Sequence, residues 1–199
     1  MKKTTTFALA ALAAVALTGT AKAQASLPLS FEGRVGAVIP TGDWGDLAKT
    51  GYGLNGNVTF NVTPIVGIYG GYTWNRFDVS DDLGGDVGDA KFTEQGFDVG
   101  LKARFAAPTG LPLTPFFRAG AIFHKVKISD SDASFSSDTK VGFDVGAGAE
   151  IAIAPRISLT PQVGYSQFNP DSSDDEELDS EDSIDVSNIH LGVGINIRL

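Results

Sequence analysis

The sequence predicts an all-β protein, an antiparallel up-and-down eight-stranded barrel that crosses a membrane. Beyond the N-terminal region the dominant hydropathy period is two, the period of a strand with one apolar face. The alternating segments are about 9–11 residues long, as a tilted strand needs to cross a bilayer. Short and long connections alternate along the chain, as expected when consecutive strands run up and down.

Residues 1–23 are predicted to be a cleavable signal peptide. Lys2 and Lys3 provide a positive start, and Ala21-Lys22-Ala23 forms a small-x-small cleavage site. The apolar stretch between them is about 11 residues long, which is too short for a helix that crosses a bilayer of roughly 30 Å. Cleavage would leave residues 24–199, enough for one domain.

The predicted mature chain is strongly acidic and has no cysteine. Removal of the signal peptide leaves 12 basic and 24 acidic residues, a net charge of −12. This charge argues against a nucleic-acid partner, which requires a basic surface. The lack of cysteine excludes disulfides and thiolate metal sites. No later stretch approaches 18 consecutive apolar residues, so a mature chain that meets a bilayer must cross it with strands.

The alternation defines eight segments, four of which are clean. The clean segments are 52–62, 97–105, 141–153 and 189–199, and the others are 30–39, 65–77, 116–128 and 157–168. Within 116–128, the apolar positions from Phe117 to Phe123 are out of phase with Val126 and Ile128. This break in phase predicts a β-bulge.

The connections fall into a short set and a long set. The short ones are 63–64, 106–115 and 155–156, and the long ones are 40–50, 78–91, 129–139 and 169–187. The long set contains 19 of the 24 acidic residues. Bacterial outer-membrane barrels have short periplasmic turns and long external loops. The pattern therefore predicts the bacterial outer membrane as the location, with both termini in the periplasm.

A soluble barrel with an apolar interior would show the same alternation with its faces inverted. Aromatic residues near the strand ends favour the membrane, because bilayer-spanning barrels carry aromatic girdles at both interfaces. These residues are Phe31, Phe60, Phe105 and Phe117 at the short-turn end, and Tyr52, Trp74, Phe77, Phe123 and Phe168 at the long-loop end.

Two sequence motifs resemble those of the OmpA/OmpX-type outer-membrane β-barrel family. One is Pro40-Thr41-Gly42-Asp43-Trp44 followed by Thr50-Gly51-Tyr52-Gly53-Leu54, and the other is the final segment 194–199. The resemblance implies that Gly194, Ile197 and Leu199 belong to a C-terminal assembly signal, although the family usually ends in an aromatic residue. It also implies that the partners are outer-membrane lipid and the outer-membrane assembly machinery.

If the apolar faces meet lipid, the opposite faces place nine charged residues inside the barrel. They are Glu32, Arg34, Asp98, Lys102, Arg104, Arg118, Asp144, Glu150 and Arg198. An eight-stranded barrel is only wide enough for its own side chains to fill, and unpaired buried charges are costly. We therefore expect these residues to pair and plug the lumen, while a selectivity filter is the alternative.

The sequence favours a non-catalytic protein without a cofactor. Only His124 and His190 could act as a histidine base, and His190 falls on the predicted inward face. The expected function is a structural or surface role for a rigid barrel that displays long acidic loops. The alternative is a narrow porin-like channel or a transporter of a small hydrophobic solute.

The acidic loops raise the question of divalent cations, which prefer carboxylate oxygens. Five acidic residues in the last loop occupy alternating places of a calcium-loop pattern: Asp171, Asp175, Glu177, Asp179 and Asp182. Glu176, however, stands where an EF-hand loop requires glycine. Solvated, mutually repelling charge is the favoured interpretation of these loops, and a cation site is the alternative.

Overall fold

The computed structural model describes residues 28–80, 91–106, 112–129, 134–170 and 185–199. The predicted signal peptide, residues 1–23, lies outside this part of the chain. Among the described residues, no helix is both long and apolar enough to cross a membrane.

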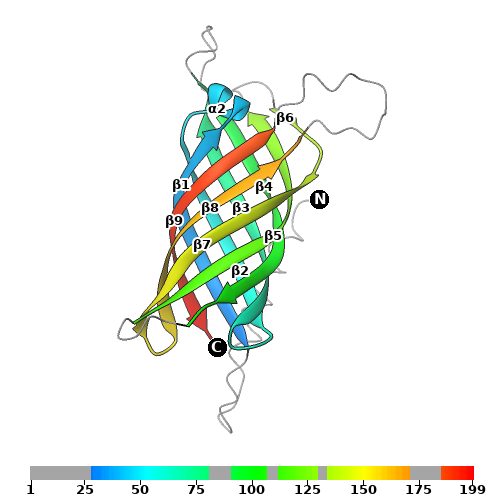
Figure 1. Cartoon of the computed structure of the whole chain (residues 1–199). Coiled ribbons are helices and arrows are strands. Elements are labelled where there is room, and N and C mark those ends of the chain that lie inside the picture. Colours follow the sequence, from blue (N-terminus) through cyan, green and yellow to red (C-terminus); the bar gives the residue numbers. More distant parts are fainter. Residues whose placement is uncertain (1–27, 81–90, 107–111, 130–133, 171–184) are drawn as a thin grey trace, which may run out of the picture.

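Eight long antiparallel strands form a closed barrel (Figure 1). They are β1 (Leu29–Thr41), β2 (Gly51–Asn61), β3 (Val66–Asp78), β4 (Lys91–Arg104), β5 (Leu113–Ser129), β7 (Lys140–Ala154), β8 (Ile157–Phe168) and β9 (Val186–Arg198). Each pairs with its neighbours in sequence, and the β1–β9 pairing closes the barrel. The predicted up-and-down eight-stranded architecture is confirmed.

Over most of the barrel, the outer face is apolar and the inner face is polar. Phe97 is 67% exposed and Val141 is 65% exposed, whereas their sequence neighbours Asp98 and Gly142 face inward. A soluble barrel would bury the apolar set instead, so the alternation has the sense expected for contact with lipid.

The expected bulge in the fifth long strand is wrong. The register between β4 and β5 runs without interruption from Lys91 opposite Ser129 to Arg104 opposite Phe116. Val126 lies on the inward face and is buried, because the interior of the barrel is apolar at this end. The change of phase in the sequence therefore marks a change in the lumen from polar to apolar, while the strand stays regular. A register shift occurs instead between β7 and β8, near Ala152.

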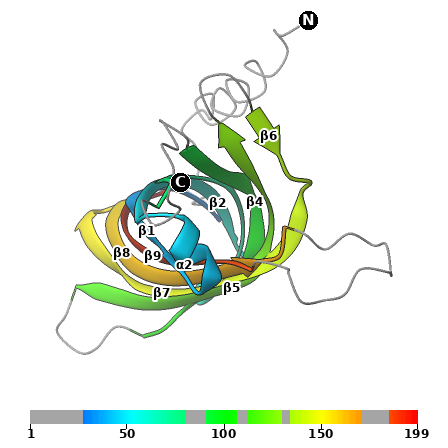
Figure 2. The ribbon, with the colours of Figure 1, turned by 90° about the horizontal axis from the view of Figure 1, so that it is seen from above.

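Three features at the long-loop end were not expected from the sequence. Strand β4 begins at Lys91, which is six residues earlier than the predicted segment. A short strand, β6 (Ser134–Ser136), pairs with the end of β5. A five-residue helix, α2 (Asp43–Leu47), follows Gly42, whose φ of 62° favours glycine. Seen along the barrel, α2 lies across the opening (Figure 2).

Candidate functional site: the barrel lumen

The lumen near the short turns contains a cluster of ion pairs centred on Glu150 of β7. One Glu150 carboxylate oxygen lies 2.9 Å from Lys102 Nζ and 2.9 Å from Arg104 Nε, and the other oxygen contacts Arg198. Lys102 Nζ also lies 3.2 Å from Glu32 Oε2. Four strands thus contribute charge to a network in which only Arg198, with 48% of its side chain exposed, reaches solvent.

A second ion pair lies further along the lumen. Arg118 Nη2 is 3.0 Å from Asp144 Oδ2, and the Tyr69 hydroxyl donates a 2.8 Å hydrogen bond to Asp144 Oδ1. Tyr69 of β3 reaches Asp144 of β7 by crossing the inner surface of β4 and β5. Gly100 and Gly120 lie side by side on that surface, and a Cβ on either would come within 2.7 Å of the Tyr69 hydroxyl. These two glycines therefore leave the space that the Tyr69 side chain occupies.

Arg34 and Gln162 line a small cavity inside the barrel. Arg34 Nη1 donates a 2.5 Å hydrogen bond to Gln162 Oε1, and Gln162 Nε2 donates a 2.8 Å bond to Glu32 Oε1. The cavity, which Arg118 and His190 also line, has a volume of about 20 Å³. This volume has room for about one water molecule.

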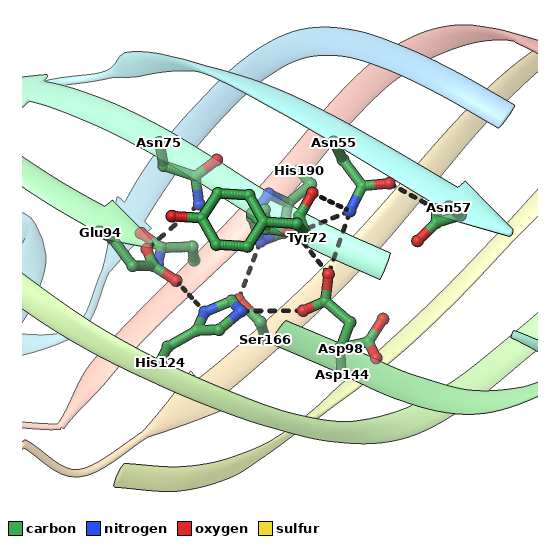
Figure 3. Close-up of polar contacts among 12 residues, drawn as sticks. Asn55, Asn57, Tyr72, Asn75, Glu94, Asp98, His124, Asp144, Ser166 and His190 are labelled. Carbon is green, nitrogen blue, oxygen red and sulfur yellow. Dashed lines mark hydrogen bonds and ion pairs between the residues drawn. The ribbon is translucent and has the colours of Figure 1, made fainter. Parts of the chain in front are cut away.

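His124 of β5 bridges two carboxylates of β4 (Figure 3). Its Nδ1 lies 2.7 Å from Glu94 Oε1 and its Nε2 lies 2.8 Å from Asp98 Oδ1. Gly96 lies between these acids and directly opposite His124, and a Cβ on it would come within 2.4 Å of the imidazole ring. Because ionised carboxylates only accept hydrogen bonds, the imidazole must donate from both nitrogens, which is its cationic form.

Amide and hydroxyl side chains donate hydrogen bonds to the second oxygen of each carboxylate. Glu94 Oε2 accepts hydrogen bonds from Asn75 at 3.2 Å and Asn188 at 2.9 Å. Asp98 Oδ2 accepts from Thr73 at 2.6 Å and from Asn55 at 3.1 Å. Glu94 is 0% exposed and His124 is 2% exposed, so this bridge is buried within the barrel.

An apolar cap lies at the long-loop end of the lumen. We define the cap by its buried residues: Val38, Trp44, Ala48, Phe77, Ile122, Val126, Phe168 and Val186. Trp44 of α2 is 4% exposed, and its ring contacts Phe77 and Phe92 edge-on at centroid distances of 6.0 and 5.0 Å. Phe168 connects the apolar cap to the His124 bridge, because its ring packs edge-on against the His124 ring at a centroid distance of 5.8 Å. The helix is thus held over the opening by burial of apolar surface.

Replacing Trp44 with alanine is expected to lower the free energy of unfolding by about 3 kcal/mol, because it leaves a void where the indole filled the cap. Urea unfolding of the folded protein in detergent micelles, followed by circular dichroism, measures the loss. Trp44→Phe is the control. It keeps an aromatic ring, and the indole Nε1 has no hydrogen-bond partner among the described residues, so we expect a loss below about 1.5 kcal/mol. Equal losses would contradict ring packing as the cause.

The structure brings together most of the charged residues that the sequence placed inside the barrel. Of the nine, Arg34 forms a hydrogen bond with Gln162 rather than an ion pair, and Arg198 is half exposed at the short-turn end. Glu94, His124 and Tyr69 also belong to this network and were not predicted from the sequence. Glu94 has the same phase as Asp98 and Lys102, so an earlier start for the strand would have included it.

The structure describes the residues of the predicted assembly signal but not those of the predicted cation site. Gly194 faces the lumen and Ile197 faces outward, with Leu199 directly after β9. Their role in assembly stays a prediction. The cation candidates Asp171, Asp175, Glu177, Asp179 and Asp182 lie outside the described residues. Within the described part of the chain, no group of three or more histidine or acidic side chains is arranged to hold a metal ion.

A closed eight-stranded barrel with an apolar outer wall and a polar lumen defines a bacterial outer-membrane barrel protein. The chain belongs to the family described as Outer membrane protein beta-barrel domain, whose sequence model matches residues 7–196. The predicted resemblance and the outer-membrane location are therefore confirmed. A search of curated protein sequences finds no match.

Solved structures share the fold at low sequence identity. Neisserial surface protein A is 12% identical with a TM-score of 0.65, and the alignment covers 88% of this chain and 100% of that one. OprG from Pseudomonas aeruginosa is 13% identical with a TM-score of 0.53, covering 89% and 100%. Ail, the attachment invasion locus protein of Yersinia pestis, is 19% identical with a TM-score of 0.51, covering 85% and 97%.

Proposed function

We propose that this protein is a non-catalytic surface protein of the outer membrane, in which a rigid barrel with a closed lumen displays long acidic external loops. The observation that carries the proposal is the filled interior. The Glu150 cluster, the Arg118–Asp144 pair and the His124 bridge occupy successive levels, and the apolar cap lies above them. A barrel of eight strands leaves little space beyond its side chains.

Planar-bilayer recording tests the closed lumen. The folded protein, identified by its faster migration in unboiled gel samples, is expected to show little or no steady conductance. A wide porin in the same bilayer supplies the positive control. Large, stable channels would overturn the closed-lumen proposal and favour the narrow porin-like channel. Uptake of a small hydrophobic solute without ion conductance would favour the transporter instead.

The histidines support a non-catalytic role. Hydrolysis by a serine or histidine mechanism requires a reactive pair that the substrate can reach. Ser166 Oγ does lie 2.8 Å from His190 Nε2, but Ser166 is buried inside the barrel (Figure 3). His124 is enclosed by two carboxylates. An esterase or protease activity that disappears with His190→Ala or His124→Ala would contradict this part of the proposal.

The acidic loops are the part of the molecule that such a barrel would present to the exterior. Solvated charge remains the favoured interpretation of residues 169–187, with weak binding of divalent cations as the alternative. Calorimetric titration of the folded protein with calcium distinguishes the two. Heat from saturable uptake at millimolar calcium would favour a cation site.

A further inference from the structure

Positive charge outside the lumen is concentrated at one place on the barrel. Of the 12 basic residues in 24–199, five are the lumenal residues described above, and Arg156 lies in the short turn between β7 and β8. The other six lie at the long-loop end of the sheet, between Lys49 and Lys140 in the sequence. Strands β1, β8 and β9 contribute none to that end. At the long-loop end, the positive charge is therefore confined to one side of the barrel.

The strand register places four of these bases on the outward face, just beyond the lipid-facing aromatics. Tyr72, Phe97 and Phe123 form one row across β3, β4 and β5. The next row on the same face, toward the loops, is Trp74, Gln95 and Lys125. The row beyond is Arg76, Thr93 and Lys127, and Lys91 lies one row further out. We call Arg76, Lys91, Lys125 and Lys127 the basic rim.

The basic rim is available to an external ligand. None of its four residues forms an ion pair with any residue in the described ranges. A surface hollow of about 430 Å³ lies beside Arg76 and Lys91, with Tyr52, Thr50 and Asp78 also in its wall. Asp78 is the one acid among the described residues of this wall, so these residues together carry a net positive charge on a chain that is acidic overall.

The position of the basic rim identifies the chemistry of its partner. Lipid chains meet the apolar wall up to the row of Tyr72, Phe97 and Phe123, so the headgroups of the same lipids lie level with the bases above it. Lysine and arginine at that level attract lipid phosphates. We propose that the basic rim binds phosphorylated headgroups of outer-leaflet lipid, and that it thereby fixes a lipid against β3, β4 and β5.

The test uses the full folded protein in nanodiscs of phosphatidylcholine that contain a minor fraction of a bis-phosphorylated glucosamine lipid. Lipid that remains bound is measured by native mass spectrometry after release from the nanodisc. Each charge near a membrane surface changes binding by about fivefold, so Arg76→Gln/Lys125→Gln/Lys127→Gln is expected to reduce retention roughly a hundredfold. Lys127→Gln is compared with Arg156→Gln, which removes one charge from the opposite end and should leave retention unchanged.

The same measurement can overturn the proposal in three ways. The triple variant could retain as much lipid as the unmodified protein while showing the same heat-modifiable migration, which establishes that it is folded. The dephosphorylated form of the glucosamine lipid could be retained equally well, which would remove phosphate as the recognised group. Inorganic phosphate at the same concentration as the lipid could displace it, which would indicate a site for free anions.

Discussion

Replacing Glu150 with glutamine will lower the free energy of unfolding by about 3–5 kcal/mol, because it leaves buried cations without their shared anion. Lys102 and Arg104 both lie 2.9 Å from one Glu150 oxygen, and both are buried. Glutamine has the same shape and keeps an acceptor, so the loss reports charge rather than a cavity. Arg198 contributes less, because its exposed side chain is screened by water.

Urea unfolding of the refolded barrel in phospholipid vesicles measures this loss, with the folded fraction read from gel mobility. Glu32→Gln is the matched control. It removes one buried carboxylate that contacts Lys102, but Lys102 keeps Glu150, so we expect a smaller loss of about 1–2 kcal/mol. Adding Lys102→Met to Glu150→Gln restores the charge balance and should recover part of the stability. A Glu150→Gln barrel as stable as the unmodified one would contradict a role for the cluster in holding the wall strands together.

The alternation of the sequence was sufficient to predict the strands of the barrel, and the aromatic residues near the strand ends indicated which face meets lipid. Segment 141–153 shows why. Apolar residues occupy every odd position, while Asp144 and Glu150 occupy even ones, so one phase assigns the whole strand to lipid or lumen. The same logic failed in β5, where Ile122 and Val126 are apolar but face inward. An alternation of apolar and polar residues identifies the two faces of a strand only where the interior of the barrel is polar. At the long-loop end the interior is apolar.

Which side chains pair with each other inside the lumen was harder to predict than which residues face it. Which charges meet depends on strand register and on side chains that cross the barrel, and neither is a property of one segment. Tyr69 reaches Asp144 only because Gly100 and Gly120 stand opposite each other, which follows from the pairing of β4 with β5. Helix α2 has five residues, too few for a helical period to stand out, and its stability comes from Trp44 packing rather than from local propensity.

The second large effect is expected at His124, where phenylalanine should lower the free energy of unfolding by about 3–5 kcal/mol. The imidazole is the cationic partner of Glu94 and the bridge to Asp98. A phenyl ring fills similar space and can pack against Phe168, so little of the loss comes from a void. It offers no donor, however, and leaves two buried carboxylates without the cation that they share.

A compensating change separates charge from shape at this site. In His124→Phe/Glu94→Gln, the glutamine oxygen can still accept from Asn75 and Asn188, and one of the two uncompensated charges is gone. We expect the double variant to recover a large part of the lost stability, measured by the same urea unfolding. His190→Gln is the control, because His190 forms a hydrogen bond with Ser166, and no hydrogen bond or ion pair joins it to a carboxylate among the described residues. Its loss should stay at about 1 kcal/mol. If His124→Phe and His190→Gln proved equally mild, the bridge would be incidental to stability, and the β4–β5 pairing alone would hold these two strands together.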